Sequence, residues 1–200
     1  MKINTKERIM EEALKLFAQT GYSGTSMSDI AGRLGITKAA LYKHYAGKQD
    51  ILNSIIHKME QMDQEHARAF EMPEGTLSEN EDAYQNVTVG LICAYTKDMF
   101  SYWTEEEFPS DFRKMLTLEQ YRDSSMNRLF HQYLAAGPTD YIKDVFRPMA
   151  DSGEEAEQLA LSFYGPVFLL FSLYDQAEDK QVVMKLLNQH LEQFTERNLK

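Results

Sequence analysis

Residues 25–50, with the sequence TSMSDIAGRLGITKAALYKHYAGKQD, constrain the fold more than any other stretch of this 200-residue chain. Ser26 is a favourable N-cap residue, and Asp29 stands three residues later, where its carboxylate can reach back to the free amides of a helix start. Ile30 and Leu34 lie four residues apart, on one apolar face of a helix. This spacing predicts a short amphipathic helix that begins after Ser26.

A tight turn and a second short helix are predicted to follow. Gly35 ends the first helix, because glycine adopts the left-handed C-cap conformation without a penalty from Cβ. Thr37 can cap a second helix over residues 38–45, in which Leu41 and Tyr45 share the buried side. Two helices joined by a turn of about three to four residues that contains glycine form a helix-turn-helix. The alternative is an ordinary helical hairpin whose polar face meets only solvent.

Basic residues are concentrated at the start of the chain. Residues 1–48 hold eight Lys/Arg against four Asp/Glu, whereas residues 49–200 hold thirteen against twenty-seven. The chain as a whole carries a net charge of −10, so a basic head precedes an acidic body. This asymmetry is expected of a protein in which the head alone meets phosphates. Chance clustering of charge is the alternative.

Apolar residues recur at helical spacing along the chain, and no segment shows the two-residue period of a strand. We therefore predict an all-α fold. Residues 1–47 are predicted to form a three-helix helix-turn-helix domain, and residues 48–200 an all-helical domain for ligand binding and dimerisation. Outside the helix-turn-helix pair, the predicted helices cover residues 4–19 (capped by Asn4 or Thr5), 48–70, 77–102, a segment starting at Pro109, 123–136, 138–150, 154–175 and 180–198.

Residues 159–174 form a strongly apolar segment of 16 residues without a charge. The segment is short for a membrane span and contains Ser, Gly and Pro, so we predict a helix buried in protein. A helix that is apolar nearly all round is either the centre of its domain or part core and part subunit interface. We favour a two-fold dimer in which this helix and the last one form a four-helix bundle. The residues predicted at the interface are Tyr164, Val167, Phe168, Phe171, Leu187 and Leu191.

Several protein classes find no support in the sequence. There is no glycine-rich phosphate loop and no nucleophile elbow, and the five histidines lack metal-ligand spacing, so we expect no enzyme, cofactor or metal site. The chain starts directly with charged helical sequence and shows no signal peptide, and it contains a single cysteine. Both features favour a cytoplasmic protein with no membrane partner. Cys93 is predicted to be a buried structural thiol, with a redox sensor as the alternative.

A long pattern in the first quarter of the chain is shared with a known family. It comprises Ala13, Leu16-Phe17, Gly21-Tyr22, Thr25-Ser26-Met27, Asp29-Ile30-Ala31, Leu34-Gly35-Ile36-Thr37, Leu41-Tyr42-Lys43-His44-Tyr45 and Lys48. In these positions the chain resembles the DNA-binding domain of TetR-type transcriptional regulators. Shorter similarities to the body of some members are Leu118-Glu119-Gln120-Tyr121 and Phe163-Tyr164-Gly165-Pro166. The resemblance implies a cytoplasmic homodimeric repressor whose helical body binds a small molecule that weakens DNA binding.

Few side chains on the second helix of the motif are suited to reading bases. Ala39 and Ala40 cannot hydrogen-bond a base edge and can contact only a thymine methyl group. Lys38 or Lys43 can reach guanine, and His44 can reach a base or a phosphate. We therefore expect phosphate contacts to carry much of the affinity.

The phosphate contacts are predicted partly from the resemblance. It implies that Tyr42 and Lys48 contact phosphates, with a solvated lysine as the alternative for Lys48. Ser26 or Ser28, together with the helix N-terminus, can bind another phosphate. The complete set predicted to contact double-stranded DNA is Ser26, Ser28, Thr37, Lys38, Ala39, Tyr42, Lys43, His44 and Lys48.

The body of the chain is rich in methionine and aromatic residues, which suit a pocket for an apolar or aromatic ligand. The residues predicted to line it are Met99, Trp103, Met115, Tyr121 and Phe163, and packing in the core is the alternative for each. We therefore predict a homodimeric repressor that a small apolar or aromatic effector releases from a palindromic operator. The alternatives are a helical protein-interaction module and a small-molecule-binding protein without operator binding.

Overall fold

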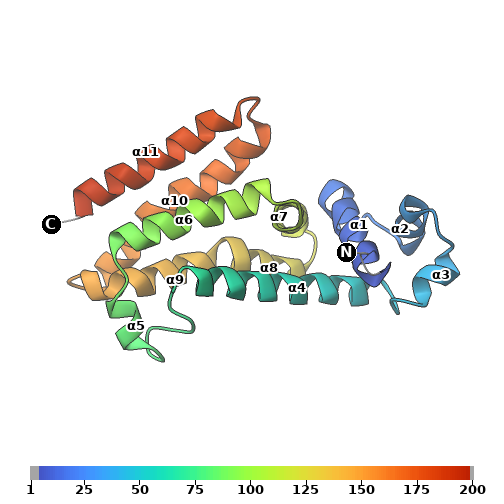
Figure 1. Ribbon diagram of the computed structural model, residues 1–200, viewed down its shortest axis with the longest axis horizontal. Helices are drawn as coiled ribbons and strands as arrows, with labels where there is room; N and C mark the ends of the chain where they lie inside the picture. The colour runs from blue at the N-terminus through green and yellow to red at the C-terminus, as the bar shows by residue number, and fades with distance from the viewer. Residues whose placement is uncertain (1–4, 199–200) are drawn as a thin grey trace. The chain divides into compact units, whose positions relative to one another are not determined.

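The computed structural model describes residues 5–198, and every regular element in this range is helical (Figure 1). The predicted all-α fold is thereby confirmed for residues 5–198. Asn4, one of the two predicted caps of the first helix, lies outside the described residues. The elements are α1 (Thr5–Thr20), α2 (Met27–Leu34), α3 (Lys38–Tyr42), α4 (Lys48–Ala69), α5 (Glu81–Gln85), α6 (Val89–Glu105), α7 (Glu107–Glu119), α8 (Ser124–Leu134), α9 (Ala136–Phe146), the 3-10 helix η1 (Arg147–Met149), α10 (Gly153–Gln176) and α11 (Lys180–Asn198).

The chain divides into two compact units. Unit 1 holds the residues up to 65 together with 106–130, and unit 2 holds 66–105 together with the residues from 131 onward. The helix-turn-helix therefore shares its unit with α7, which comes more than 50 residues later in the chain. The domain boundary predicted after residue 47 coincides with the start of α4, and it stays a prediction.

Unit 1 is built on α1, α4 and α7. Ile9 and Phe17 of α1 are 1% and 0% exposed, and α7 lies beside α1 (Figure 1). On α4, the Lys58 ammonium donates to Glu11 Oε1 of α1 at 3.2 Å and lies 4.6 Å from the ring centroid of Phe108. The helix α2 packs against α1, and α3 packs against α2.

Unit 2 is built on α6 and α9–α11. In Figure 1, α10 and α11 run antiparallel to each other and are joined by a short turn. Phe163 of α10 contacts Phe146 of α9 and Phe194 of α11, with ring centroids 5.4 Å and 4.8 Å apart. Phe100 of α6 stacks on Phe171 of α10 at 5.1 Å. The aromatic residues of the body are therefore largely used to pack its helices together.

The helix predicted over residues 77–102 is wrong in its first half. The chain forms the short helix α5, breaks after it, and starts α6 at Val89. Thr88 explains the break, because its Oγ1 accepts from the Leu91 N–H at 3.1 Å and so supplies the cap of a new helix. The Asn86 amide donates to the Asp82 carbonyl at 2.8 Å, which satisfies the end of α5.

Two further helix boundaries differ from the prediction. The second helix of the motif ends at Tyr42 rather than at residue 45, because the Lys43 and His44 amides bond three residues back, as in a tightened last turn. Tyr45 is still 2% exposed, with its hydroxyl donating to the Lys6 carbonyl at 3.1 Å. The helix expected from Pro109 begins at Glu107, which places the proline in the first turn, where it costs no helical hydrogen bond.

The helix α10 has the length and mean hydropathy of a membrane span. Over its apolar window 39% of the residues are buried inside the protein. A single such helix is weak evidence for a membrane, because core helices of soluble proteins share these properties.

Candidate nucleic-acid interface

The first helix of the motif has the ends that the sequence predicts. The Ser26 hydroxyl accepts from the Asp29 N–H at 3.2 Å, and the Ser26 N–H donates to Asp29 Oδ2 at 2.8 Å, which completes a capping box. The hydrogen bonds from Ser26 lower the pKa of the Asp29 carboxyl. At the other end Gly35 adopts a φ of 66°, and the Ile36 N–H donates to the Ala31 carbonyl at 3.0 Å.

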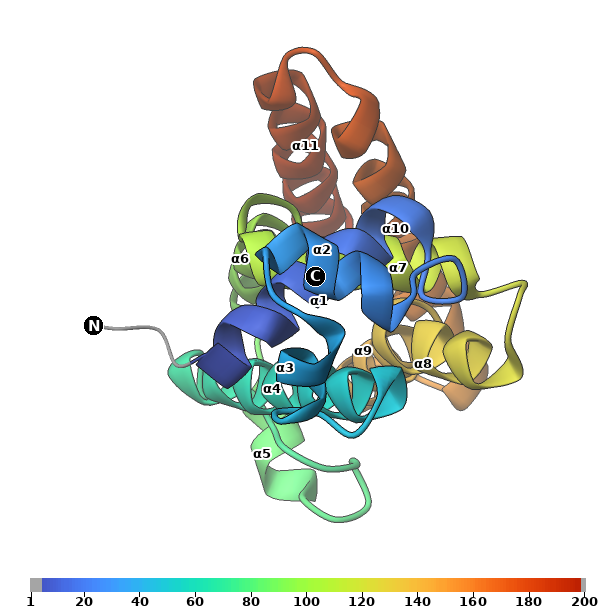
Figure 2. The same ribbon diagram turned by 90° about the vertical axis from the view of Figure 1, so that its right-hand side faces the viewer.

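The second helix presents one side to the core and the other to solvent. Thr37 Oγ1 accepts from the Ala40 N–H at 3.1 Å and so caps α3, while Leu41 is fully buried. Figure 2 views the motif from the side on which α2 and α3 lie. The predicted contact residues that are exposed on and after α3 are Lys38, Ala39, Tyr42, Lys43 and His44. All five are accessible to solvent, and their contact with DNA stays a prediction.

Lys48 has partners that the sequence did not reveal. Its ammonium donates to the carbonyls of Tyr22 and Thr25 at 2.6 Å and 2.8 Å and lies 4.3 Å from the Tyr22 ring centroid. Burial lowers the pKa of this ammonium, and the negative charge of Glu119 opposes that shift. Two of its three N–H groups are thus used inside the protein, so its contact with a phosphate stays a prediction.

The two serines predicted to bind a phosphate differ in availability. The Ser26 hydroxyl donates to Asp29 Oδ2 at 2.6 Å, so it is engaged by a carboxylate at the same helix end. That carboxylate also repels a phosphate there. Ser28 is the second residue of α2 and is exposed. Between the two, Ser28 is the better placed to meet DNA.

The five residues predicted to line a ligand pocket are distributed over both units, and their role as a lining stays a prediction. Met115 is buried in unit 1, whereas Tyr121, in the turn after α7, is 89% exposed. In unit 2, Trp103 contacts the rings of Tyr102 and Tyr133, Phe163 lies in the aromatic cluster of α9–α11, and Met99 is half-buried. For Phe163, core packing is the role that its contacts support.

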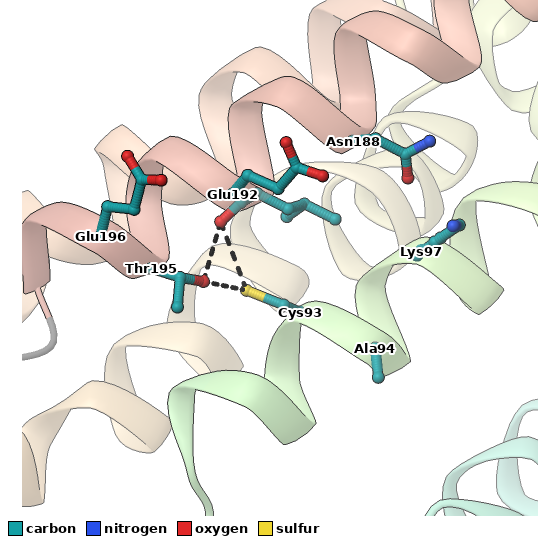
Figure 3. A pocket seen from close by; sticks show the side chains of 8 residues that line it. Cys93, Ala94, Lys97, Asn188, Glu192, Thr195 and Glu196 are labelled. Atoms are coloured by element: carbon teal, nitrogen blue, oxygen red, sulfur yellow. Dashed lines mark hydrogen bonds between the residues drawn. The ribbon is translucent and has the colours of Figure 1, made fainter.

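A groove of about 370 Å³ lies between α6 and α11 in unit 2 (Figure 3). None of the five predicted pocket residues contributes to it. Its lining residues are Cys93, Ala94, Lys97, Asn188, Leu191, Glu192, Thr195 and Glu196. The charged side chains along its edge and its open form do not suit the enclosed apolar site that the sequence predicts for an effector.

The Cys93 thiol sits in this groove beside a hydroxyl. Cys93 Sγ and Thr195 Oγ1 are 3.4 Å apart, and burial raises the pKa of the thiol although the hydrogen bond to Thr195 opposes the shift (Figure 3). A thiol with a raised pKa holds little thiolate at neutral pH, which disfavours a redox role.

We expect Cys93 in the folded protein to react with a disulfide reagent at pH 7 at least about tenfold more slowly than in the urea-unfolded chain. The release of the reagent's coloured thiol measures both rates. A Thr195→Val variant serves as the control, because loss of the hydroxyl removes a contact that favours the thiolate and so should not speed the reaction. Equal rates in the folded and unfolded protein would show that the thiol is reactive.

The residues predicted at a dimer interface need correction. Val167, Phe171, Leu187 and Leu191 are between 0% and 7% exposed, because they face the core of unit 2. Tyr164 is half-buried, and its hydroxyl donates to the Leu134 carbonyl at 2.9 Å. Of the six predicted residues, Phe168 alone is exposed, at 41%. The apolar residues that α10 and α11 do expose are Leu161, Phe168, Leu169, Leu173, Val182 and Leu186.

The fold and the exposed face of α3 define a helix-turn-helix protein with an all-helical body. The family model for bacterial regulatory proteins of the tetR family matches residues 9–55, which includes the whole motif. The HTH-type transcriptional regulator AcrR of Shigella flexneri is 25% identical over 155 residues, which are 77% of this chain and 61% of that protein. The negative regulator IcaR of the icaADBC biofilm operon in Staphylococcus epidermidis is 44% identical over 46 residues, 23% of this chain and 25% of IcaR.

Solved structures share the fold across nearly the whole chain. A transcriptional regulator of the TerR/AcrR family from Aquifex aeolicus VF5 superimposes with a TM-score of 0.65 at 18% identity, covering 94% of this chain and 98% of that one. AibR in complex with isovaleryl coenzyme A and operator DNA gives a TM-score of 0.63 at 20% identity, with coverages of 93% and 97%. The family match over residues 9–55, the similarity to AcrR and the shared fold support a regulator of the tetR family.

Proposed function

We propose that the protein is a DNA-binding transcriptional regulator that binds a palindromic operator as a homodimer and acts as a repressor in the cytoplasm. The observation that carries the proposal is the exposed polar face of α3 on a motif capped at both helices. Repression is proposed because IcaR, which is similar over the motif, is a negative regulator. The chain matches only part of the length of AcrR and IcaR, so these relatives support the DNA-binding part most directly.

The composition of the face on α3 favours phosphate contacts over base reading. Ala39 offers a base only its methyl group, whereas Lys38 and Lys43 carry charges that attract phosphates or bind guanine. Tyr42 is 46% exposed, so its hydroxyl is available to a phosphate. The excess of basic residues among the first 48 adds a long-range attraction that the acidic remainder of the chain lacks.

The effector is proposed to be a small molecule with an apolar or aromatic part, which lowers operator affinity when it binds. AibR, which has the same fold, was solved with isovaleryl coenzyme A. Acyl thioesters are therefore the first compounds to test as effectors in the operator-binding assay. The methionine and aromatic residues of the body are the reason for expecting an apolar ligand.

The salt dependence of binding to the DNA upstream of its own gene tests the proposed function. We expect the binding constant, measured by fluorescence anisotropy on a labelled duplex, to fall about 100-fold or more between about 50 and about 200 mM salt. A shuffled duplex of equal length is the control and should bind more weakly at every salt concentration. Absence of binding at the lowest salt would contradict the proposal and favour a protein-interaction module.

A further inference from the structure

A fully buried carboxylate lies under the turn that joins α1 to α2. Glu119 is the last residue of α7, its side chain is 0% exposed, and it is the only Asp or Glu among residues 5–198 that is buried. Burying a carboxylate costs free energy unless hydrogen bonds or an opposite charge compensate it. The face of α3 that meets DNA in the proposed function gives Glu119 no role, so its burial calls for a separate explanation.

Both oxygens of Glu119 accept hydrogen bonds from one residue of the turn. The Ser23 N–H donates to Oε1 at 3.3 Å, and the Ser23 hydroxyl donates to Oε2 at 2.6 Å. Arg122, whose side chain is 55% exposed, donates to Oε1 at 3.2 Å and supplies the opposite charge. Hydrogen bonds to a carboxylate are stronger than those between neutral groups, so Ser23 is held firmly against α7.

The turn has a backbone that fits this carboxylate closely. Gly21 adopts a φ of 83°, and a Cβ at this position would overlap Glu119 Oε1. The residue must therefore be glycine for two reasons, its conformation and the approach of the carboxylate. The Thr25 hydroxyl donates to the Gly21 carbonyl at 2.8 Å and closes the turn. The turn and Glu119 thus form one packed assembly within unit 1.

The other side of the same turn binds Lys48. The carbonyls of Tyr22 and Thr25, which flank Ser23 in the turn, accept from the Lys48 ammonium. Lys48 is the first residue of α4, and Ser26, directly after Thr25, caps α2. A displacement of the turn would therefore move the starts of α2 and α4 together. These two helix starts flank α3 in the chain.

We propose that Glu119 is a positioning residue for DNA binding, which holds the α1–α2 turn so that Lys48 and the start of α2 keep the arrangement that the operator requires. The inference rests on the proposed function. In this proposal α7, which belongs to the predicted ligand-binding part of the chain, contributes to DNA binding through Glu119.

Three variants test the role of Glu119. Glu119→Ala removes the carboxylate and should weaken operator binding about 3- to 30-fold, the range typical of changes in a coupling network. Glu119→Gln keeps an acceptor for the Ser23 N–H and a hydrogen bond to its hydroxyl, so it should restore affinity to within about twofold. Ser23→Ala removes a single hydrogen bond at an exposed residue and extends the test if Glu119→Ala does not fold.

Amide hydrogen exchange gives a readout that does not depend on DNA. Glu119→Ala should speed exchange in peptides that cover residues 20–26 and also in those that cover 46–52, because the turn binds Lys48. A Tyr141→Phe variant, which loses the hydrogen bond from its hydroxyl to the Pro73 carbonyl in unit 2, is the control for general destabilisation and should leave both peptides and operator binding unchanged.

The outcomes separate this inference from the proposed function. Unchanged operator affinity in Glu119→Ala, or a loss that Tyr141→Phe matches at equal thermal stability, would overturn the positioning role. Exchange that accelerates at residues 20–26 but not at 46–52 would also overturn it, because the link to Lys48 would be missing. If the unaltered protein binds no operator, the proposed function fails, and with it the role in DNA binding. The exchange data would still decide whether Glu119 holds Lys48.

Discussion

Replacing Tyr42 and Lys43 with alanine is expected to weaken operator binding about 100-fold. A hydrogen bond from Tyr42 to a charged phosphate contributes about 1.5–3 kcal/mol, and a lysine that reaches guanine about 1–3 kcal/mol, so 100-fold lies near the lower end of the combined loss. The fold should survive, because Tyr42 is 46% exposed and Lys43 also points to solvent. Fluorescence anisotropy on the operator duplex measures the affinity, and circular dichroism measures the melting temperature.

A matched double variant distinguishes a local contact from a general change in charge. Tyr121→Ala with Arg128→Ala also removes one aromatic ring and one positive charge from exposed positions of unit 1, outside the helix-turn-helix. We expect its operator affinity to stay within about threefold of the unaltered protein, because neither residue is among the proposed DNA contacts and exposed charges elsewhere act only through screened long-range fields. Equal losses in the two double variants would argue against α3 as the DNA-binding surface.

The salt dependence of the Tyr42→Ala and Lys43→Ala double variant adds information on the type of contact. Each lost phosphate contact from a cation should reduce the slope of the logarithm of the binding constant against that of salt by about one. If Lys43 instead binds guanine, the slope should change less, and discrimination against operator variants should fall more. The same titrations therefore separate positioning contacts from base reading.

The local features of the motif could be predicted because they depend on neighbours in sequence. The capping box of Ser26 and Asp29, the left-handed Gly35 and the cap at Thr37 involve residues within five positions of one another. The same local logic applies to Thr88. Its side chain caps a new helix in the structure, although the apolar period on both sides of it predicted one continuous helix. Short-range chemistry thus predicts where helices start and stop.

Contacts between distant parts of the chain could not be predicted in this way. Ser23 and Glu119 are 96 positions apart, and nothing in either local sequence indicates that one binds the other. The partners of Lys48 are backbone carbonyls, which leave no trace in side-chain patterns. The prediction for Lys48 therefore rested on a resemblance, and the structure adds a bracing role that sequence reasoning missed.

The error at the predicted dimer interface has a similar cause. A helix that is apolar nearly all round shows no preferred face, so its sequence cannot tell which side packs on its own domain. In the structure Val167 and Phe171 take the inner side, and Leu169 and Leu173 take the outer one. That this helix carries a contact surface stays a prediction, which we now place on different residues.

The exposed apolar side chains of unit 2 support a dimer through α10 and α11. Six of the ten large apolar residues exposed in the described chain lie on these two helices, so the exposure is concentrated rather than scattered. On α10, Leu161, Leu169 and Leu173 recur at intervals of eight and four residues, and on α11 Val182 and Leu186 are four apart, which places each set on one helix face. Two such helices from each protomer can form a four-helix bundle around a two-fold axis.

Replacing Leu169 and Val182 with glutamate is expected to convert a dimer into a monomer of 23.2 kDa and to weaken operator binding about 100- to 10,000-fold. Burying two charges per protomer in an apolar interface costs more free energy than apolar burial contributes there, so the protomers separate. Each monomer then binds a half-site on its own. Light scattering at micromolar concentration measures the mass. The control, Tyr121→Glu with Met149→Glu, places the same charges on exposed apolar residues outside α10 and α11, and it should remain a dimer that binds DNA. A mass of 23.2 kDa for the unaltered protein would rule out the dimer. If the unaltered protein is recovered only in the membrane fraction, α10 is a membrane contact instead.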